Sequence, residues 1–182
     1  MKDHKLYFND QSEYFAHQAW KNLKLDLPVD LSVVANKLSI VVEEREFDES
    51  IDGLYLRMPG APAIIAINSS YVKPISRRRF TLAHEIGHHL LCHKITPDKR
   101  LFFLDSSRPG KSNLEFMCDK FAALLLMPEE LIRKHFDELS YNINQRLDVL
   151  ADRFGVSKWA MRRRLKELGL FTPFRFYKKQ DD

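Results

Sequence analysis

The sequence His-Glu-Ile-Gly-His at residues 84–88 constrains this chain more than any other feature. Two histidines four positions apart lie one turn apart on the same face of a helix. Both imidazole rings can then reach one Zn²⁺ ion at about 2.0–2.1 Å. We therefore expect a helix over residues 75–92, capped by Ser76, with a metal-binding face. The pattern also occurs by chance on helices, so it needs support from elsewhere in the chain.

Glu85 follows the first histidine directly and lies beside the same helix face. A carboxylate in this position can accept a proton from water at the metal and pass it to a leaving amine. Gly87 removes bulk just before the second histidine. The pattern therefore predicts that His84 and His88 are metal ligands and that Glu85 is the catalytic base.

A second segment offers a third ligand. Residues 114–126 are strongly apolar and contain neither Gly nor Pro, which predicts a buried helix. Glu115 and Asp119 are four positions apart and share one face of it. Catalytic zinc usually keeps three protein ligands and an open position, so we expect Glu115 as the third ligand and Asp119 as the acceptor for a ligand histidine. The alternative is that the acidic pair forms the solvent face of an amphipathic helix.

The rest of the chain predicts an α+β fold, with a small mixed or antiparallel sheet packed on a helical metallopeptidase core. Apolar residues near helical spacing predict a first helix at 10–25, and Asp30 can cap a short second helix. Three strands are expected, at residues 39–43, 53–58 and 63–67. The segment 94–112 contains Pro, Gly, Ser and Lys, so we expect a loop or flap beside the metal helix.

The C-terminal part resembles a helix-turn-helix. Within residues 147–168, Gly155 occupies the turn and Ser157 caps the second helix, and such a unit can place that helix in a DNA groove. The alternative is a hairpin packed on the rest of the chain through its apolar residues. We therefore divide the chain into a metallopeptidase domain, 1–140, and a helix-turn-helix-like part, 141–182, packed on the same domain.

The composition is that of a globular chain. It has 182 residues, 45% hydrophobic and 30% charged, with a net charge of +4, which permits nucleic-acid binding without requiring it. The arginine runs 77–79 and 162–164 each predict a solvated helix face. No apolar stretch reaches about 18 residues, and the N-terminus resembles no signal peptide, so we expect no membrane span. Cys92 and Cys118 form no disulfide framework, which favours reduced thiols and a cytoplasmic location.

Two blocks of the sequence resemble the signature of the ImmA/IrrE family of zinc metallopeptidases. The first is residues 77–88, and the second is residues 121–128 with Glu115 and Asp119 ahead of them. Shorter stretches also match, at residues 28–31, 154–157, 164–165 and 168–170. The resemblance runs over residues 15–171 and is specific only in the two blocks. Many members carry a second glutamate where this chain has Met117, and Glu115 is preferred as the ligand because only it has an aspartate four positions later.

The resemblance implies a gluzincin-like site in which His84, His88 and Glu115 bind zinc and Glu85 is the base. It also implies a zinc-dependent endopeptidase that cleaves a helix-turn-helix transcriptional repressor or antitoxin, which would relieve repression in stress response or mobile-element control. Mn²⁺ or Fe²⁺ could occupy the same ligand set. The alternative is a non-catalytic zinc-binding regulator or toxin–antitoxin component that acts through DNA or partner binding.

Several residues near the predicted site are left open by the sequence. His89, His93 and Tyr141 are each candidates for stabilising the oxyanion. The favoured interpretation is instead a surface position for His89 and a helix-end position for His93, where a histidine suits the helix dipole. Cys118 lies beside Asp119 on a buried helix, and we expect an inert core thiol there.

Overall fold

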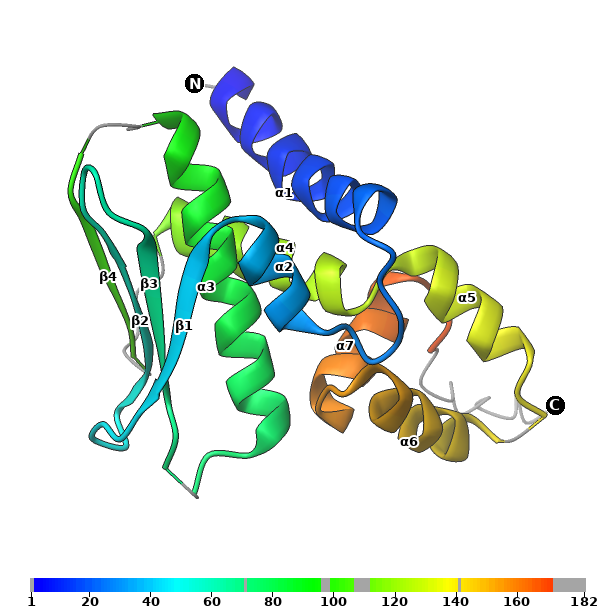
Figure 1. The fold of residues 1–182 in the computed structure, drawn as a ribbon. Helices are drawn as coiled ribbons and strands as arrows, with labels where there is room; N and C mark the ends of the chain where they lie inside the picture. The colour runs from blue at the N-terminus through cyan, green and yellow to red at the C-terminus, as the bar shows by residue number, and fades with distance from the viewer. Residues whose placement is uncertain (1, 71, 96–98, 107–111, 141, 172–182) are drawn as a thin grey trace, which may run out of the picture.

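The computed structural model describes residues 2–70, 72–95, 99–106, 112–140 and 142–171. The helices are α1 (Lys2–Asn22), α2 (Leu31–Lys37), α3 (Ile75–Ile95), α4 (Asn113–Leu126), α5 (Glu129–Asp137), α6 (Ile143–Phe154) and α7 (Lys158–Glu167). The strands are β1 (Ile40–Arg45), β2 (Ile51–Arg57), β3 (Ala63–Asn68) and β4 (Leu101–Ser106). The sheet lies on the left of Figure 1, α3 runs beside it, and α5 to α7 form the right side. The expected α+β class, including the C-terminal hairpin, is confirmed.

The four strands form one mixed sheet in the order β1-β3-β2-β4. Strand β1 pairs with β3 in parallel, whereas β2 is antiparallel to both β3 and β4. The loop expected at residues 94–112 is wrong where β4 lies, because Phe102 and Leu104 alternate with Leu101 and Phe103 and the strand pairs with β2. The sequence shows no polar–apolar alternation here, because residues 101–104 are all apolar.

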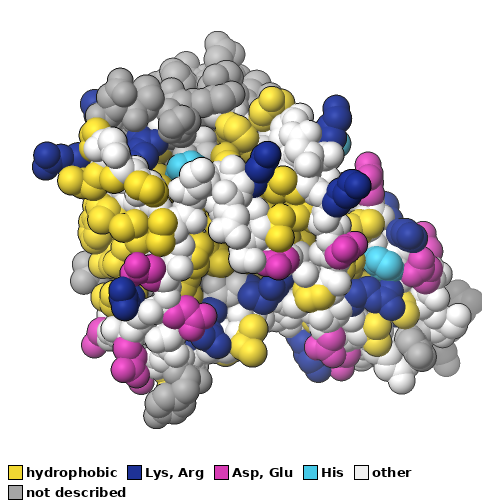
Figure 2. Space-filling model, in the orientation of Figure 1, with side chains coloured by type: hydrophobic (Ala, Val, Ile, Leu, Met, Phe, Trp, Pro, Cys, Tyr) yellow, Lys and Arg dark blue, Asp and Glu magenta, His cyan; other side chains and the backbone are white. Residues whose placement is uncertain are grey.

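The two faces of the sheet differ in what they contact. Tyr55 is fully buried and Arg57 is 7% exposed, because their side of β2 faces the interior where α3 packs. Leu54 and Leu56 lie on the opposite face and are only half-buried. Figure 2 shows hydrophobic side chains gathered on the left of the molecule, over the sheet. The sheet therefore keeps one apolar face outside the core.

Helix α3 begins at Ile75, as the sequence indicates, but a different residue caps it. The backbone N–H groups of Arg77 and Arg78 donate to the carbonyl of Pro74, so Ser76 lies inside the helix and the expected Ser76 cap is wrong. The carbonyl of the residue before a helix accepts its first hydrogen bonds, and Pro74 fills that position. The Asp30 cap of α2 is confirmed, since its side chain accepts from the N–H of Ser32.

Helices α3 and α4 pack very closely at Gly87. A Cβ atom added there would lie 3.2 Å from the Cα of Cys118 and 3.1 Å from Cδ1 of Phe121. Any larger residue would push the helices apart, so glycine permits this approach. Helix α1 holds α4 from the other side, where Ser12 and Trp20 donate to carbonyls of α4, each at 2.9 Å. The result is a fixed distance between the two helices that carry the predicted site.

The C-terminal hairpin shares the main hydrophobic core. Phe154, Met161 and Leu165 are fully buried and belong to the same cluster as Leu125 of α4. Gly155 ends α6 with φ of 64°, in the left-handed region that glycine tolerates. The division of the chain at residues 140 and 141 stays a prediction. Within the described part of the chain, no helix combines the length and apolar character that a membrane span requires.

Candidate metal centre

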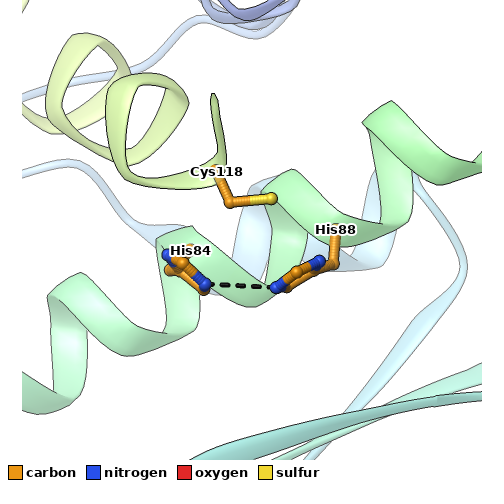
Figure 3. A group of neighbouring side chains, drawn as sticks. All are labelled: His84, His88 and Cys118. Atoms are coloured by element: carbon orange, nitrogen blue, oxygen red, sulfur yellow. Dashed lines mark hydrogen bonds between the residues drawn. The ribbon is translucent and has the colours of Figure 1, made fainter. Parts of the chain in front are cut away.

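The two histidines of the predicted motif lie on one face of α3 and point into the same space. His84 and His88 are each 1% exposed, and their Nε2 atoms are 3.1 Å apart. Figure 3 shows the two rings approaching each other, with Cys118 of α4 beside them. The structure therefore brings together the side chains that the four-residue spacing places on one face.

Glu115 from α4 completes a cluster of three donor groups. Its carboxylate oxygens lie 3.1 Å from Nε2 of His84 and 3.1 Å from Nε2 of His88. Two ligands that each stand about 2.0–2.1 Å from a tetrahedral ion are about 3.3 Å apart, a consequence of zinc's bond lengths and geometry. The observed separations are close to this value, so the three groups fit a single metal ion.

Asp119 lies behind His84 rather than among the three donor groups. Its Oδ1 is 2.9 Å from Nδ1 of His84. A carboxylate at Nδ1 keeps the proton on that nitrogen, which leaves the Nε2 lone pair for a metal. The contact places Asp119 where a residue that orients His84 would lie, and the role itself stays a prediction. Nδ1 of His88 is buried and has no hydrogen-bond partner in the described part of the chain, so the second ring lacks a comparable orienting group there.

Glu85 is fully buried beside the histidine pair. Among the described residues, neither of its carboxylate oxygens has a hydrogen-bond partner. Burial raises the pKa of Glu85 to about 8, against the lowering effect of His84 nearby. Buried polar atoms without partners are rare in folded proteins and usually have a specific explanation. A reactive carboxyl group that awaits a substrate, water or metal is such an explanation.

The charges around the cluster favour a cation at its centre. Burial alone would lower the pKa of His84, but hydrogen bonds to Asp119 and Glu115 outweigh it and raise this pKa to about 10. Burial lowers the pKa of His88. Hydrogen bonds from the two histidines hold the pKa of Glu115 well below its usual range. The carboxylates of Glu115 and Asp119 thus contact the histidine rings. Their negative charge is balanced by a proton on His84, and a divalent metal would balance it in the same way.

Cys118 is a second candidate for the third ligand. It is fully buried, and its Sγ lies within 4.8 Å of the ligand nitrogens of His84 and His88. Burial raises the pKa of this thiol well above its ordinary value, which disfavours the thiolate that a metal requires. Glu115 is the better candidate because each of its carboxylate oxygens lies 3.1 Å from the Nε2 atom of one of the two histidines. Sequence reasoning missed Cys118 as a candidate, although it stands three positions after Glu115 on the same helix.

The strand missed in the sequence contributes to the site as well. The ring of Phe103 in β4 stacks on His88 with centroids 4.2 Å apart and planes 12° apart. His89 points elsewhere, since its Nδ1 is 3.1 Å from the hydroxyl of Tyr55, whose pKa burial raises to about 12. The other two oxyanion candidates, the side chain of His93 and Tyr141, lie outside the described residues.

Comparison with known proteins agrees with these observations. The radiation response metalloprotease IrrE of Deinococcus deserti is 46% identical over 72 residues, which is 38% of this chain and 24% of that protein. A Mycobacterium tuberculosis transcriptional regulator has a TM-score of 0.54 at 16% identity, over 90% of this chain and 48% of that one, and shows the fold alone. The IrrE N-terminal-like domain, a peptidase family, matches residues 35–166. The chain therefore belongs to the IrrE N-terminal-like domain family of peptidases.

Proposed function

We propose that this protein is a metal-dependent endopeptidase that cleaves a helix-turn-helix transcriptional repressor or antitoxin at a specific peptide bond. One observation carries the proposal. The Nε2 atoms of His84 and His88 and the carboxylate of Glu115 lie 3.1 Å from one another, beside the buried carboxyl group of Glu85. Membership of a peptidase family supports the reaction class.

In this proposal His84, His88 and Glu115 hold the metal, with Zn²⁺ as the favoured ion and Mn²⁺ or Fe²⁺ as alternatives. A metal bound there supplies Lewis acidity to a water molecule and to the carbonyl of the bond to be cleaved. Asp119 keeps the ring of His84 oriented through its 2.9 Å contact with Nδ1. Phe103, stacked on His88, restricts the second ring.

Glu85 moves the protons in this proposal. A carboxylate oxygen of Glu85 accepts a proton from the attacking water and then delivers it to the leaving amine. Burial raises the pKa of Glu85 to about 8, and a carboxylate with a raised pKa is a stronger base than an exposed one. The carboxyl group has no competing hydrogen bond among the described residues.

The substrate class rests on the family. The matching relative is named a radiation response metalloprotease, and a peptidase that removes a repressor would give such a response. The segment matched covers only 24% of that relative, and the repressor substrate is a proposal for this chain. We place the reaction in the cytoplasm, where transcriptional repressors act.

The experiment is to incubate the metal-loaded protein with a helix-turn-helix repressor of the same organism. We expect one defined cut. The Glu85→Gln variant should keep its metal and its fold and lose cleavage, because Gln is nearly isosteric and cannot act as a base. Cleavage by Glu85→Gln at the parental rate would show that the base lies elsewhere.

A matched pair of variants tests the third ligand. Glu115→Ala should lose bound metal, whereas Cys118→Ala should keep the parental stoichiometry and affinity. Asp119→Ala should retain metal with about 10–100-fold weaker affinity, as expected of a residue that orients a ligand. The reverse result for Glu115→Ala and Cys118→Ala would replace Glu115 with Cys118 in the site.

A further inference from the structure

A groove of about 1770 Å³ lies beside the candidate metal centre. Helices α1, α4, α5 and α7 surround this helical groove, together with two residues of α3 (Figure 1). Its apolar lining includes Trp20, Phe80, Leu124, Met127, Leu131 and Trp159. Ligand sites for small molecules have volumes of about 300–1,000 Å³. The helical groove is larger, as a site for a polypeptide would be.

The helical groove lies next to the metal centre. Asp119, which contacts the ring of His84, also lines the groove, and so does Phe116, the residue next to Glu115. Phe80 precedes His84 by one helical turn on the same face of α3, and it lines the groove too. A polypeptide whose cleaved bond lies at the metal centre would therefore pass close to this groove.

The charges at the rim of the helical groove largely neutralise one another. Lys120 pairs with Glu13 at 2.6 Å, and Arg133 pairs with Glu129 at 2.7 Å. Arg163 of α7 pairs with Glu167 at 3.1 Å. A phosphate-rich ligand such as DNA needs cations that are not already paired. An apolar surface with a balanced polar rim is instead typical of a protein–protein interface.

The walls of the helical groove favour a helix over an extended strand as its occupant. Every lining residue belongs to a helix or to a short connection between helices, and none belongs to a strand of the sheet. An extended segment would find no strand edge with which to pair its backbone N–H and C=O groups. A helix satisfies these groups internally and can place an apolar stripe on the floor of the groove.

We propose that the helical groove binds an amphipathic helix of the protein substrate, next to the bond that is cleaved. The identity of the occupant rests on the proposed function. Trp159 is the main anchor, because it lines the groove from α7 and is 70% exposed. The guanidinium of Arg163 lies 5.9 Å from its ring centroid and steadies it. Tryptophan and arginine dominate the energetics of many protein interfaces.

The test uses the same helix-turn-helix repressor with the metal-loaded protein. Trp159→Ala and Ala160→Glu, which places a charge in the helical groove, should each raise KM about tenfold, with kcat within about twofold. Binding of the intact repressor to the same variants made in Glu85→Gln should weaken by a similar factor, measured by calorimetry. Phe102→Ala is the control, because it removes another exposed aromatic ring, on the outer face of the sheet.

The outcomes separate this inference from the proposed function. Repressor binding that depends on Trp159, without any cleavage, would support the groove and refute the peptidase. Cleavage with unchanged KM and binding in both groove variants would refute the groove and leave the peptidase standing. Loss of duplex DNA binding in Trp159→Ala, with repressor binding intact, would also overturn the inference. Absence of both binding and cleavage would overturn the two together.

Discussion

Two runs of three arginines, residues 77–79 and 162–164, have the same sequence and different surroundings. The first run makes contacts within the fold, where Arg79 donates to the carbonyls of Val29 at 2.8 Å and Gly155 at 3.1 Å. The second run lies mostly at the surface, where Arg163 is 60% exposed and pairs with Glu167. One run joins distant parts of the chain, and the other borders the helical groove.

The difference shows that a run of arginines in the sequence does not by itself determine whether the side chains are solvated or form contacts within the fold. We expected a solvated helix face for both runs, and the first is not one. Arg77 forms an ion pair with the buried Asp52 of β2, so this run begins with a contact between α3 and the sheet. Arg162 instead lies over the ring of Phe171, 4.9 Å from its centroid. The elements packed around each helix determine which guanidinium groups find partners.

The largest effect is expected at Arg79. Arg79→Met keeps the apolar stem and leaves two carbonyls without their donor, so it should lower the free energy of unfolding by about 2–3 kcal/mol. Arg163→Met is the control in the other run and should cost about 0.5 kcal/mol or less. Urea unfolding of both variants measures the contrast. Equal losses would remove the distinction between the runs.

The next effect is expected at Asp52, the partner of Arg77 and Lys73. Burial alone would raise the pKa of Asp52, but hydrogen bonds from these two cations outweigh it and hold the pKa below 3.8. The stabilisation is therefore present above pH 3.8 and is lost as the pH falls through the lowered pKa. Asp52→Asn should cost about 1–2 kcal/mol at pH 7 and flatten this acid dependence. Urea midpoints between pH 2 and 7 test it, and an unchanged acid profile would contradict it.

A smaller effect is expected at Arg164. This residue differs from its neighbours in the second run because its side chain is largely buried. Its side chain is 11% exposed, and its Nε donates to the carbonyl of Met127 at 3.2 Å. Arg164→Met should cost about 1 kcal/mol in thermal or urea unfolding, in keeping with one hydrogen bond. A loss of stability smaller than that of Arg163→Met would show that none of the three arginines in the second run contributes to the stability of the fold.

The smallest effect is expected for Arg162→Ala combined with Arg163→Ala. Stability should change by less than about 0.5 kcal/mol, because both side chains are exposed. The protein should also show no tight binding to a specific DNA duplex at physiological salt. Binding through phosphates falls with salt at a log–log slope of about −0.9 per contact, so anisotropy titrations at two salt concentrations decide the matter. Tight, specific binding lost in this variant would favour the regulator alternative.

Local features of the fold were predictable from the sequence. Asp30 and Ser157 cap their helices, and Gly155 takes the left-handed conformation of the turn, because each depends on a few neighbouring residues. Strand β4 was not predictable in the same way. It has six residues, and what makes it a strand is its pairing with β2, far away in the sequence. Because the strand was not predicted, the stacking of Phe103 on His88 was not predicted either.

The candidate site likewise has features that the sequence predicts and features that it does not. The spacing of His84 and His88, and that of Glu115 and Asp119, predicts which side chains share a helix face. It does not predict the distance between the two helices, which depends on side-chain packing. The 3.1 Å contacts of Glu115 and the position of Cys118 therefore came only from the structure.

The close packing at Gly87 has a thermodynamic consequence. The carboxylate of Glu115 contacts both histidines, one with each oxygen, across the same helix pair that Gly87 allows to approach. An ion held by these three groups would hold α3 and α4 together, and it would be released when they separate. Ligands that bind only the native state add RT ln(1 + [L]/Kd) to its stability. The free energy of unfolding of the whole chain would then rise with the free metal concentration. Folding and metal supply would be coupled.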